Sequence, residues 1–311
     1  MSLNSLSNQC CKTAFQAVRA DHLECLAAMS KSDLSSRETS GQTPLHIAAK
    51  LNRLKIVDFL LKHVPETQNV ISLYGENAIL TAAAEGHFGV VRTLLSDGSL
   101  KTATMRAMHR DINGTSVLML AVAYEDNDTA FWLLKRFGKA LAMLPNKCLM
   151  LPLHVAAAQG NIEFIRVVTK YDSHMANFRD EFGCTACVYA IQCGSLLCLR
   201  YLVEKCRANL ASVSDRGQSL LHVACLAGYP HIVQWILQRS VPNIIFWTTS
   251  HNANAIHFAA FSGCVGALRI MLKGIDKKRR KTVLALRDLR SNTPLHLTAI
   301  NNHIEAAQYL V

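Results

Sequence analysis

The sequence predicts an all-α solenoid of about nine helix–turn–helix units that are joined by β-turn or hairpin fingers. The first observation is a short motif at residues 41–49 that returns, with substitutions, as far as residues 291–299. The second is its spacing, because a period of about 33 residues is typical of stacked helical repeats. The third is composition. The 311 residues are 50% hydrophobic but only 7% aromatic, which suits thin helices that pack alanine and leucine.

The motif at residues 41–49 reads Gly-Gln-Thr-Pro-Leu-His-Ile-Ala-Ala. It returns in altered form at residues 217–225, 252–260 and 291–299. A Thr-Pro-Leu-His-x-Ala-Ala core in a unit of about 33 residues is the signature of the ankyrin repeat. The chain therefore resembles the ankyrin-repeat family from about Lys12 to Val311. The resemblance implies a non-enzymatic scaffold that holds a partner peptide or domain in a concave groove.

The repeats are expected to form a single ankyrin-repeat domain over residues 12–311, after an N-terminal tail of residues 1–11. The first unit, residues 12–40, lacks Thr-Pro-Leu-His but keeps the helix–turn–helix spacing. Its partly polar face suits a capping repeat, which meets water on its outer side. The later units start near Gly41, Gly75, Gly114, Leu149, Gly183, Gly217, Asn252 and Ser291.

Two units are longer than the others, the one that begins at Gly75 and the one that begins at Asn252. Their extra residues, 99–110 and 274–281, follow the second helix of the unit. We predict that these insertions extend loops without breaking the stack, because added loop length costs little free energy.

Each unit is expected to form the same pair of helices. Thr43 and Thr293 supply N-cap oxygens, and Pro44 suits the first helical position, where its missing N–H is not needed. The second helix carries an apolar stripe at i, i+3 and i+4 spacing. Glycines between the helices are expected at φ > 0, and an acidic residue before each motif suits a β-turn. These residues are Gly86, Gly160, Gly194, Gly228 and Gly263, and Glu38, Asp111, Asp180 and Asp288.

The last unit ends at Val311, and Ala306, Ala307, Leu310 and Val311 resemble a face that awaits another neighbour. We therefore expect that the chain is a fragment or short isoform of a longer protein, or that it ends against a partner. We expect a monomer, unless this C-terminal repeat self-associates.

The formal net charge is +11, and residues 276–281 form one dense basic run, Asp-Lys-Lys-Arg-Arg-Lys. We interpret the run as a solvated loop, with a nuclear-localisation or phosphate-binding patch as the alternative. The other positive charges are scattered and are not interleaved with aromatic residues. Nucleic-acid binding is therefore not expected.

The chain has 11 cysteines, an odd number, and its first residues lack the apolar region of a secretory signal. No apolar run approaches the roughly 18 residues of a membrane span, so direct membrane insertion is not expected. We predict free thiols in a reduced, cytoplasmic location. Association with the cytoskeleton and a nuclear location are the alternatives.

Two groups of residues carry potential chemistry. Cys184, Cys187, Cys193, Cys198 and Cys206 could suggest zinc, but their register points them in different directions along two helices. Histidines at one repeated place favour a hydrogen-bond network within each unit over catalysis. They are His46, His154, His222, His257 and His296. No nucleophile–base arrangement or phosphate loop is apparent, so we expect no enzyme activity, no cofactor and no metal.

The candidate binding surface consists of residues that change from repeat to repeat. Exposed tyrosine, phenylalanine and arginine are the types that carry binding energy at protein interfaces. The candidates on the helices are Lys50, Arg53, Glu85, Tyr124, Glu125, Gln159, Gln192, Leu226, Tyr229 and Phe261. The candidates on the fingers are Tyr74, Phe182, Arg216 and Arg290. Phe246 and Trp247 form an apolar loop that either tucks under the next repeat or anchors a partner.

Within the ankyrin-repeat family, the chain resembles the N-terminal repeats of espin and its fly relative forked. The resemblance is carried by residues 113–121, 151–160, 199–206 and 255–260, for example Leu-Arg-Tyr-Leu-Val-Glu-Lys-Cys at residues 199–206. It implies a scaffold in actin-based protrusions whose repeats bind the tail of a class III myosin or another cytoskeletal protein. Two alternatives are the cytosolic domain of a membrane channel and a substrate adaptor or transcription regulator that uses the basic loop.

Overall fold

The chain folds into stacked helix pairs, as predicted. The computed structural model describes residues 10–239, 243–273 and 275–311. Residues 1–9 of the predicted N-terminal tail therefore lie outside the described residues.

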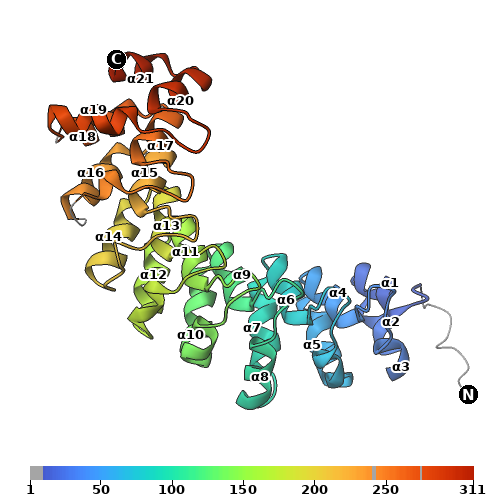
Figure 1. Ribbon diagram of the computed structural model, residues 1–311. Coiled ribbons are helices and arrows are strands. Elements are labelled where there is room, and N and C mark those ends of the chain that lie inside the picture. The colour runs from blue at the N-terminus through green and yellow to red at the C-terminus, as the bar shows by residue number, and fades with distance from the viewer. Residues whose placement is uncertain (1–9, 240–242, 274) are drawn as a thin grey trace, which may run out of the picture. The chain divides into compact units, whose positions relative to one another are not determined.

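Contacts along the chain divide it into two compact units, Met1–Lys147 and Cys148–Val311. Figure 1 labels the helices of both units, and each unit is described by itself. The expectation of one domain over residues 12–311 stays a prediction.

The first unit is a stack of antiparallel helix pairs with short connections. Its pairs are α1 with α2, α4 with α5, α6 with α7, and α9 with α10. Its helices are α1 Ala14–Arg19, α2 Leu23–Ala27, α3 Lys31–Leu34, α4 Pro44–Lys50, α5 Leu54–His63, η1 Pro65–Asn69, α6 Ala78–Ala84, α7 Phe88–Ser96, α8 Leu100–Ala107, α9 Val117–Ala123 and α10 Asn127–Ala142. Gly138, at φ 68°, breaks α10 near its C-terminal end.

The second unit repeats the same plan. Its pairs are α11 with α12, α13 with α14, α15 with α16, α17 with α18, and α20 with α21. Its helices are α11 Pro152–Gln159, α12 Ile162–Val168, η2 Ser173–Asn177, α13 Ala186–Gln192, α14 Leu196–Glu204, α15 Leu220–Ala227, α16 Pro230–Arg239, η3 Ile244–Phe246, α17 Ala255–Phe261, α18 Val265–Lys273, α19 Lys277–Ala285, α20 Pro294–Ile300 and α21 Ile304–Leu310.

The ends of the first helices follow from local sequence. Thr43 is the N-cap of α4, and its hydroxyl lies 2.9 Å from Nδ1 of His46. Asn77 caps α6 directly, because its Oδ1 accepts a 3.0 Å bond from the N–H of Leu80. The turn glycines have positive φ, for example 77° at Gly86, which confirms that prediction.

The core of each unit lies between its helix pairs. The paired alanines Ala48 and Ala49 are fully buried, so neighbouring first helices pack closely. The second helices bury the predicted stripe, for example Ile56, Val57 and Leu60 in α5. Burial of these aliphatic side chains supplies the main stabilising term, at about 1.5–3 kcal/mol for each of the larger ones.

The two insertions are helices, so the prediction of extended loops was wrong. Residues 99–110 contain α8, which Ser99 begins by accepting a 3.3 Å bond from the N–H of Thr102. In the second insertion, residues 277–281 form the start of α19. Its N-cap Asp276 accepts a 3.0 Å bond from the N–H of Arg279. A capping residue followed by good helix formers is sufficient to turn an insertion into a helix. Residue 274 of the second insertion lies outside the described residues.

The face presented by the last repeat agrees only in part with the predicted one. Ala306 and Leu310 are buried, because these residues, at i and i+4, point into the contact of α21 with α18 and α20. Ala307 and Val311 lie on the outward face as predicted, and Ile304 joins them around a shallow hollow of about 480 Å³.

Candidate functional site

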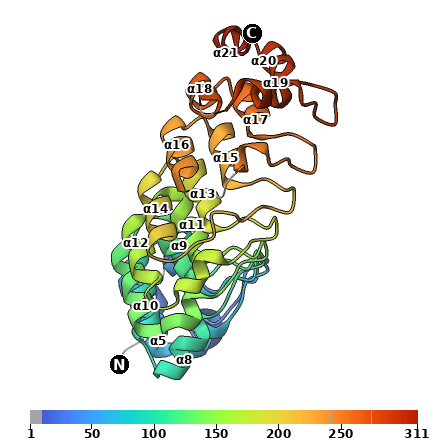
Figure 2. The same ribbon diagram turned by 60° about the vertical axis from the view of Figure 1, so that its left-hand side comes forward.

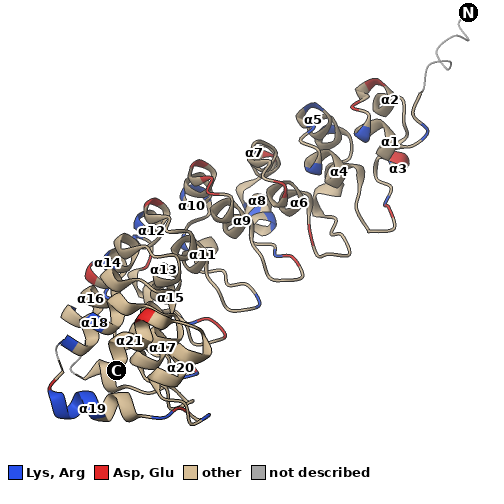
Figure 3. Ribbon diagram, turned by 90° about the horizontal axis from the view of Figure 1, so that it is seen from above, with Lys and Arg blue, Asp and Glu red and all other residues tan. Residues whose placement is uncertain are grey.

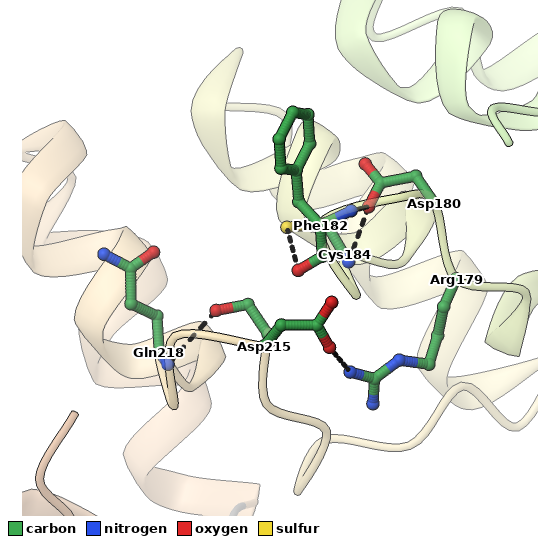
Figure 4. Close-up of polar contacts among 7 residues, drawn as sticks. Arg179, Asp180, Phe182, Cys184, Asp215 and Gln218 are labelled. Carbon is green, nitrogen blue, oxygen red and sulfur yellow. Dashed lines mark hydrogen bonds and ion pairs between the residues drawn. The ribbon is translucent and has the colours of Figure 1, made fainter. Parts of the chain in front are cut away.

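The fingers between repeats are tight turns closed by a side-chain oxygen. In the finger before α13, Oδ1 of Asp180 accepts the N–H groups of Phe182 at 2.9 Å and Cys184 at 2.8 Å (Figure 4). Asp111 and Asp288 accept two N–H groups in the same way in their fingers. These bonds confirm the β-turn role predicted for the three aspartates, whereas the carboxylate of Glu38 pairs with Arg19 instead.

Successive fingers within a unit are joined through their backbones. In the second unit, the N–H of Asp215 donates to the carbonyl of Phe182 at 3.0 Å, and the N–H of Ser250 donates to the carbonyl of Arg216 at 2.9 Å. Arg179 and Asp215 add an ion pair at 2.8 Å, which Figure 4 also shows. Figure 2 shows these fingers projecting on one side of their helix pairs. These hydrogen bonds and the ion pair fix the position of each fingertip relative to the next one in the same unit.

The fingertip candidates are exposed. Tyr74 is 57% exposed and Phe182 is 58% exposed, and Arg216 and Arg290 are also exposed. Because their backbones are fixed by the turn, these side chains are presented to solvent without a disordered loop.

In the first unit, several predicted surface residues contact one another. Lys50 pairs with Glu85 at 3.5 Å, and Arg53 pairs with Asp21 at 3.1 Å. Such exposed pairs contribute about 0–1 kcal/mol. Each pair joins neighbouring repeats, so these four side chains also have a role inside the stack.

Tyr124 and Glu125 lie at the turn between α9 and α10. Tyr124 donates its hydroxyl hydrogen to the carbonyl of Ala84, and its ring stands edge-on to Phe88 at 5.9 Å. Glu125 has φ 58° at the place where other repeats have glycine. Tyr124 therefore joins α9 to α6, and half of its surface remains exposed.

In the second unit, an exposed apolar row crosses three neighbouring first helices. Leu226 in α15 is 43% exposed, Phe261 in α17 is 49% exposed and Ile300 in α20 is 66% exposed. The hydroxyl of Ser262 donates to the carbonyl of Cys225 at 2.7 Å, and the amide of Asn301 donates to the carbonyl of Phe261 at 3.3 Å. These bonds hold the ends of the three helices beside one another. We call Leu226, Phe261 and Ile300 the apolar row.

The other helix candidates of the second unit are less prominent. Tyr229 is partly buried, because its ring covers the backbone of Gly194. Gln159 is partly buried and Gln192 is exposed. Phe246 and Trp247 are also only partly exposed. Phe246 is the last residue of η3 and Trp247 is its C-cap, and the carbonyl of Trp247 lies 3.1 Å from Nε2 of His222.

The repeated histidines are parts of the fold. In His222, Nδ1 accepts the N–H of Ser219 at 3.1 Å, which leaves Nε2 as the donor to the carbonyl of Trp247. Burial lowers the pKa of His222 to about 4 and also lowers the pKa values of His46, His154 and His257. These imidazoles are therefore neutral near pH 7, and each ties its own repeat to the segment that follows.

The cysteines around Cys184 differ in burial, and three of them, Cys187, Cys198 and Cys206, are buried. Burial raises the pKa of Cys187 to about 12 and that of Cys184 to about 11. Cys198 is buried in α14, and Sγ of Cys193 lies 3.2 Å from the carbonyl of Ala157. A thiol must lose its proton to become a metal ligand or nucleophile, so burial disfavours both roles for Cys184, Cys187 and Cys198. Cys193 is exposed.

One group of side chains was missed in the sequence. It is a set of potential metal ligands, Cys10, Cys11, His22 and Cys25. The vicinal Cys-Cys pair followed by His-x-x-Cys is the signal that could have indicated it.

Positive charge gathers on α19. Figure 3 shows the dense basic stretch at the start of this helix. Lys277, Lys278 and Arg279 are exposed, and Arg279 pairs with the capping carboxylate of Asp276 at 3.5 Å. The predicted basic loop is thus an ordered, solvated helix.

The helix pairs, the fingers and the exposed row define a helical repeat protein that presents its variable residues on turn tips and first helices. Family models for ankyrin repeats match residues 14–105, 118–213 and 206–281, and a further ankyrin repeat model matches residues 290–311. The chain belongs to the ankyrin-repeat family.

Curated relatives of this chain have varied names. The E3 ubiquitin-protein ligase XBAT32 of Arabidopsis thaliana is 28% identical over 163 residues, which cover 51% of this chain and 28% of the ligase. Rabankyrin-5 of Mus musculus is 27% identical over 52% of this chain and 13% of its own length. The probable 26S proteasome regulatory subunit p28 of Saccharomyces cerevisiae is 25% identical over 61% of this chain and 82% of its own length.

The match thus spans less than a third of the length of XBAT32 and of Rabankyrin-5. Among the residues that the structure describes, no helix has the length and hydrophobicity needed to span a bilayer.

Proposed function

We propose that this chain is a protein-interaction module whose second unit binds a segment of a partner protein on the apolar row. The observation that carries the proposal is the alignment of three exposed apolar side chains at the same place of successive repeats. Polar side chains would be expected at solvent-facing places, and a continuous exposed apolar surface is typical of a binding site.

The chemistry of the row specifies the kind of partner. Leu226 and Ile300 offer branched aliphatic surface on either side of the Phe261 ring. Neighbouring packed helices lie about 8–10 Å apart, so the row matches a partner segment that places apolar residues at such intervals. An amphipathic helix or an extended strand with alternating apolar residues meets this requirement.

The experiment compares photo-crosslinking at two exposed apolar positions of the second unit. A benzophenone amino acid replaces Phe261 in the row, and in a matched protein it replaces Leu197, an exposed leucine of α14. Both proteins are added to lysate of the source organism, and crosslinked proteins are identified by mass spectrometry. We expect a discrete partner at position 261 that is absent at position 197.

Binding of the purified partner then tests the row directly. The triple variant L226S/F261S/I300S should weaken Kd at least about tenfold, since one buried interface anchor is worth more than 1 kcal/mol. The variant Leu197→Ser should leave Kd unchanged. Equal binding by the triple variant, with circular dichroism showing a folded protein, would rule out the row as the binding site.

Two finer hypotheses follow from the family resemblance and from the relatives. The espin-like hypothesis predicts that the crosslinked partner is a myosin tail or another cytoskeletal protein, although no relative named above has a cytoskeletal name. The substrate-adaptor hypothesis draws on the similarity to XBAT32, whose name describes a ubiquitin-protein ligase. It predicts that the partner is turned over more slowly when the apolar row is disrupted.

A further inference from the structure

Three thiols and one imidazole converge beside the first helix pair. Nδ1 of His22 lies 3.0 Å from Sγ of Cys10 and 3.4 Å from Sγ of Cys11. Sγ of Cys10 lies 3.7 Å from Sγ of Cys11 and 3.5 Å from Sγ of Cys25. All four ligand atoms lie within 4.8 Å of one another, and no other group of three or more such side chains occurs in the part of the chain that the structure describes.

These separations match the edges of a tetrahedral metal site. Zinc binds a thiolate sulfur at about 2.3 Å and an imidazole nitrogen at about 2.0–2.1 Å. At tetrahedral angles, two such sulfurs lie roughly 3.8 Å apart and a sulfur and a nitrogen roughly 3.5 Å apart. The two sulfur–sulfur separations from Cys10, at 3.7 and 3.5 Å, and the 3.4 Å between Cys11 and His22 are within about 0.3 Å of these values, and the 3.0 Å between Cys10 and His22 is about 0.5 Å shorter. We propose that Cys10, Cys11, His22 and Cys25 bind one Zn²⁺ ion.

The register of the repeat explains how two of the ligands meet. His22 precedes α2 and Cys25 follows three places later, so both side chains lie on one face at the start of the helix. In the next repeat the same two places hold Arg53, which pairs with Asp21, and Ile56, which is fully buried. The first repeat therefore has two potential ligands where the next repeat has an ion pair and an aliphatic core residue.

The other two ligands come from the segment before α1. Thr13 is the N-cap of α1 as Thr43 is of α4, so Cys10 and Cys11 take the places of Ser40 and Gly41. In later repeats this segment is held by the next finger, as the bond from the N–H of Leu73 to the carbonyl of Ser40 shows. A metal ion would instead fasten this segment to the beginning of α2.

The ligand set favours zinc over other metals. Three thiolates and one imidazole in a tetrahedral arrangement form the Cys₃His set of structural zinc sites. Hard cations such as Mg²⁺ and Ca²⁺ require oxygen ligands. Because no protein carboxylate belongs to the cluster, these cations are excluded. The three thiol protons pass to buffer as the thiolates bind the ion.

The test measures zinc binding to the full chain. Protein purified with a reductant is stripped with a chelator, reloaded with ZnSO₄, desalted and analysed for metal and protein. We expect about one zinc ion per chain, and zinc-edge X-ray absorption should show three sulfur neighbours at about 2.3 Å and one nitrogen neighbour.

Cys10→Ser and His22→Ala remove exposed ligands and are expected to leave the repeat folded. Each should weaken zinc affinity at least about tenfold in a competition with a chromophoric chelator. Cys148→Ser is the matched control, because it removes an exposed thiol far from the cluster in sequence. It should retain full zinc binding.

Three results would overturn the proposal. They are less than about 0.2 zinc per reduced chain, unchanged affinity in both ligand variants, or an equal loss in Cys148→Ser. A disulfide between Cys10 and Cys25 is the competing chemistry. Peptide mapping without reductant would detect it, and failure of the reduced protein to take up zinc would then assign the cluster to thiol oxidation.

Discussion

Two kinds of repeat form the same helix pair with different chemistry. The repeats that begin at Gly41, Leu149, Gly217 and Asn252 place a buried imidazole in the third position of the first helix. The repeats that begin at Gly114 and Gly183 have Met119 and Val188 at that position, and both side chains are buried. The backbone arrangement is shared, so the imidazole is one solution and apolar packing is another.

The two kinds of repeat differ in which backbone carbonyls accept a hydrogen bond from a side chain. His154, His222 and His257 in the second unit reach the carbonyls of Phe178, Trp247 and Leu286 at 3.1 Å. These carbonyls lie in the segment that leads to the next finger. The repeat that begins at Gly75 also lacks the imidazole and has buried Leu80 at that position. Nδ2 of its N-cap Asn77 donates instead to the carbonyl of Arg106 at 3.2 Å. Of these side chains, only the imidazole of histidine changes its charge with pH.

The largest expected effect that separates the two kinds of repeat is acid destabilisation. Since the folded-state pKa of His222 is lowered to about 4 from an unfolded value near 6.5, the unfolded chain binds protons more readily. Stability is therefore complete above pH 6.5 and falls as pH drops towards 4, by roughly 3 kcal/mol for this residue.

Hydrogen exchange followed by mass spectrometry at pH values between 7 and 4.5, corrected for intrinsic rates, would locate the loss. Protection should fall first in α15 and η3, and last in α9 and α13. Glu76 opposes the trend near His46, because burial raises its carboxyl pKa and its protonation in acid favours the folded state. A uniform loss of protection along the chain would contradict the expected difference between repeats with and without a buried imidazole.

Removing one imidazole should have the next largest effect. His222→Ala leaves the carbonyl of Trp247 without its donor and opens a cavity, so we expect a loss of about 3 kcal/mol at pH 7. His296→Ala is the matched control, because this histidine has the same N-cap contact but is exposed. It should cost less than about 1 kcal/mol. Urea unfolding monitored by circular dichroism would measure both.

Asn77→Ala should have a smaller effect, of about 1–2 kcal/mol, since it removes an N-cap and one bridging bond. Its effect should be the same at pH 7 and pH 5, because an amide does not titrate in this range. A loss of stability by Asn77→Ala that is larger at pH 5 than at pH 7 would show that the pH dependence of contacts between repeats does not originate in the imidazoles.

The smallest expected effect is a gain. Glu125 has φ 58°, a backbone conformation that glycine adopts at the same turn in other repeats. Glu125→Gly should raise stability by about 0.5–1 kcal/mol. The matched change Asn52→Gly, at φ 57°, should gain less, because asparagine tolerates this region better. Thermal unfolding of the two variants would compare them.

The sequence was sufficient for the repeat architecture because each repeat is specified by local residues. Pro44, the paired alanines and Asp180 act within a few residues of themselves, so their roles could be predicted directly. The histidine network was also predicted as structural, because it recurs in register.

What could not be predicted depends on contacts between segments that are distant in sequence. The pairing of Lys50 with Glu85 requires knowledge of which side chains of neighbouring repeats meet. Likewise, His22 and Cys25 become candidate ligands only when the segment with Cys10 and Cys11 folds back on α2. The insertion helices were missed although Ser99 and Asp276 are ordinary helix-capping residues, because insertions were expected to be loops.

The two insertion helices have a practical consequence. α8 and α19 each lie between the second helix of a repeat and the next finger, and both have exposed surfaces, for example at Met105 and Lys278. Because the flanking repeats keep their helix pairs and fingers, the chain already tolerates added sequence at these points. An epitope tag or a fluorophore-binding peptide grafted there should report on either unit while leaving its binding surface intact.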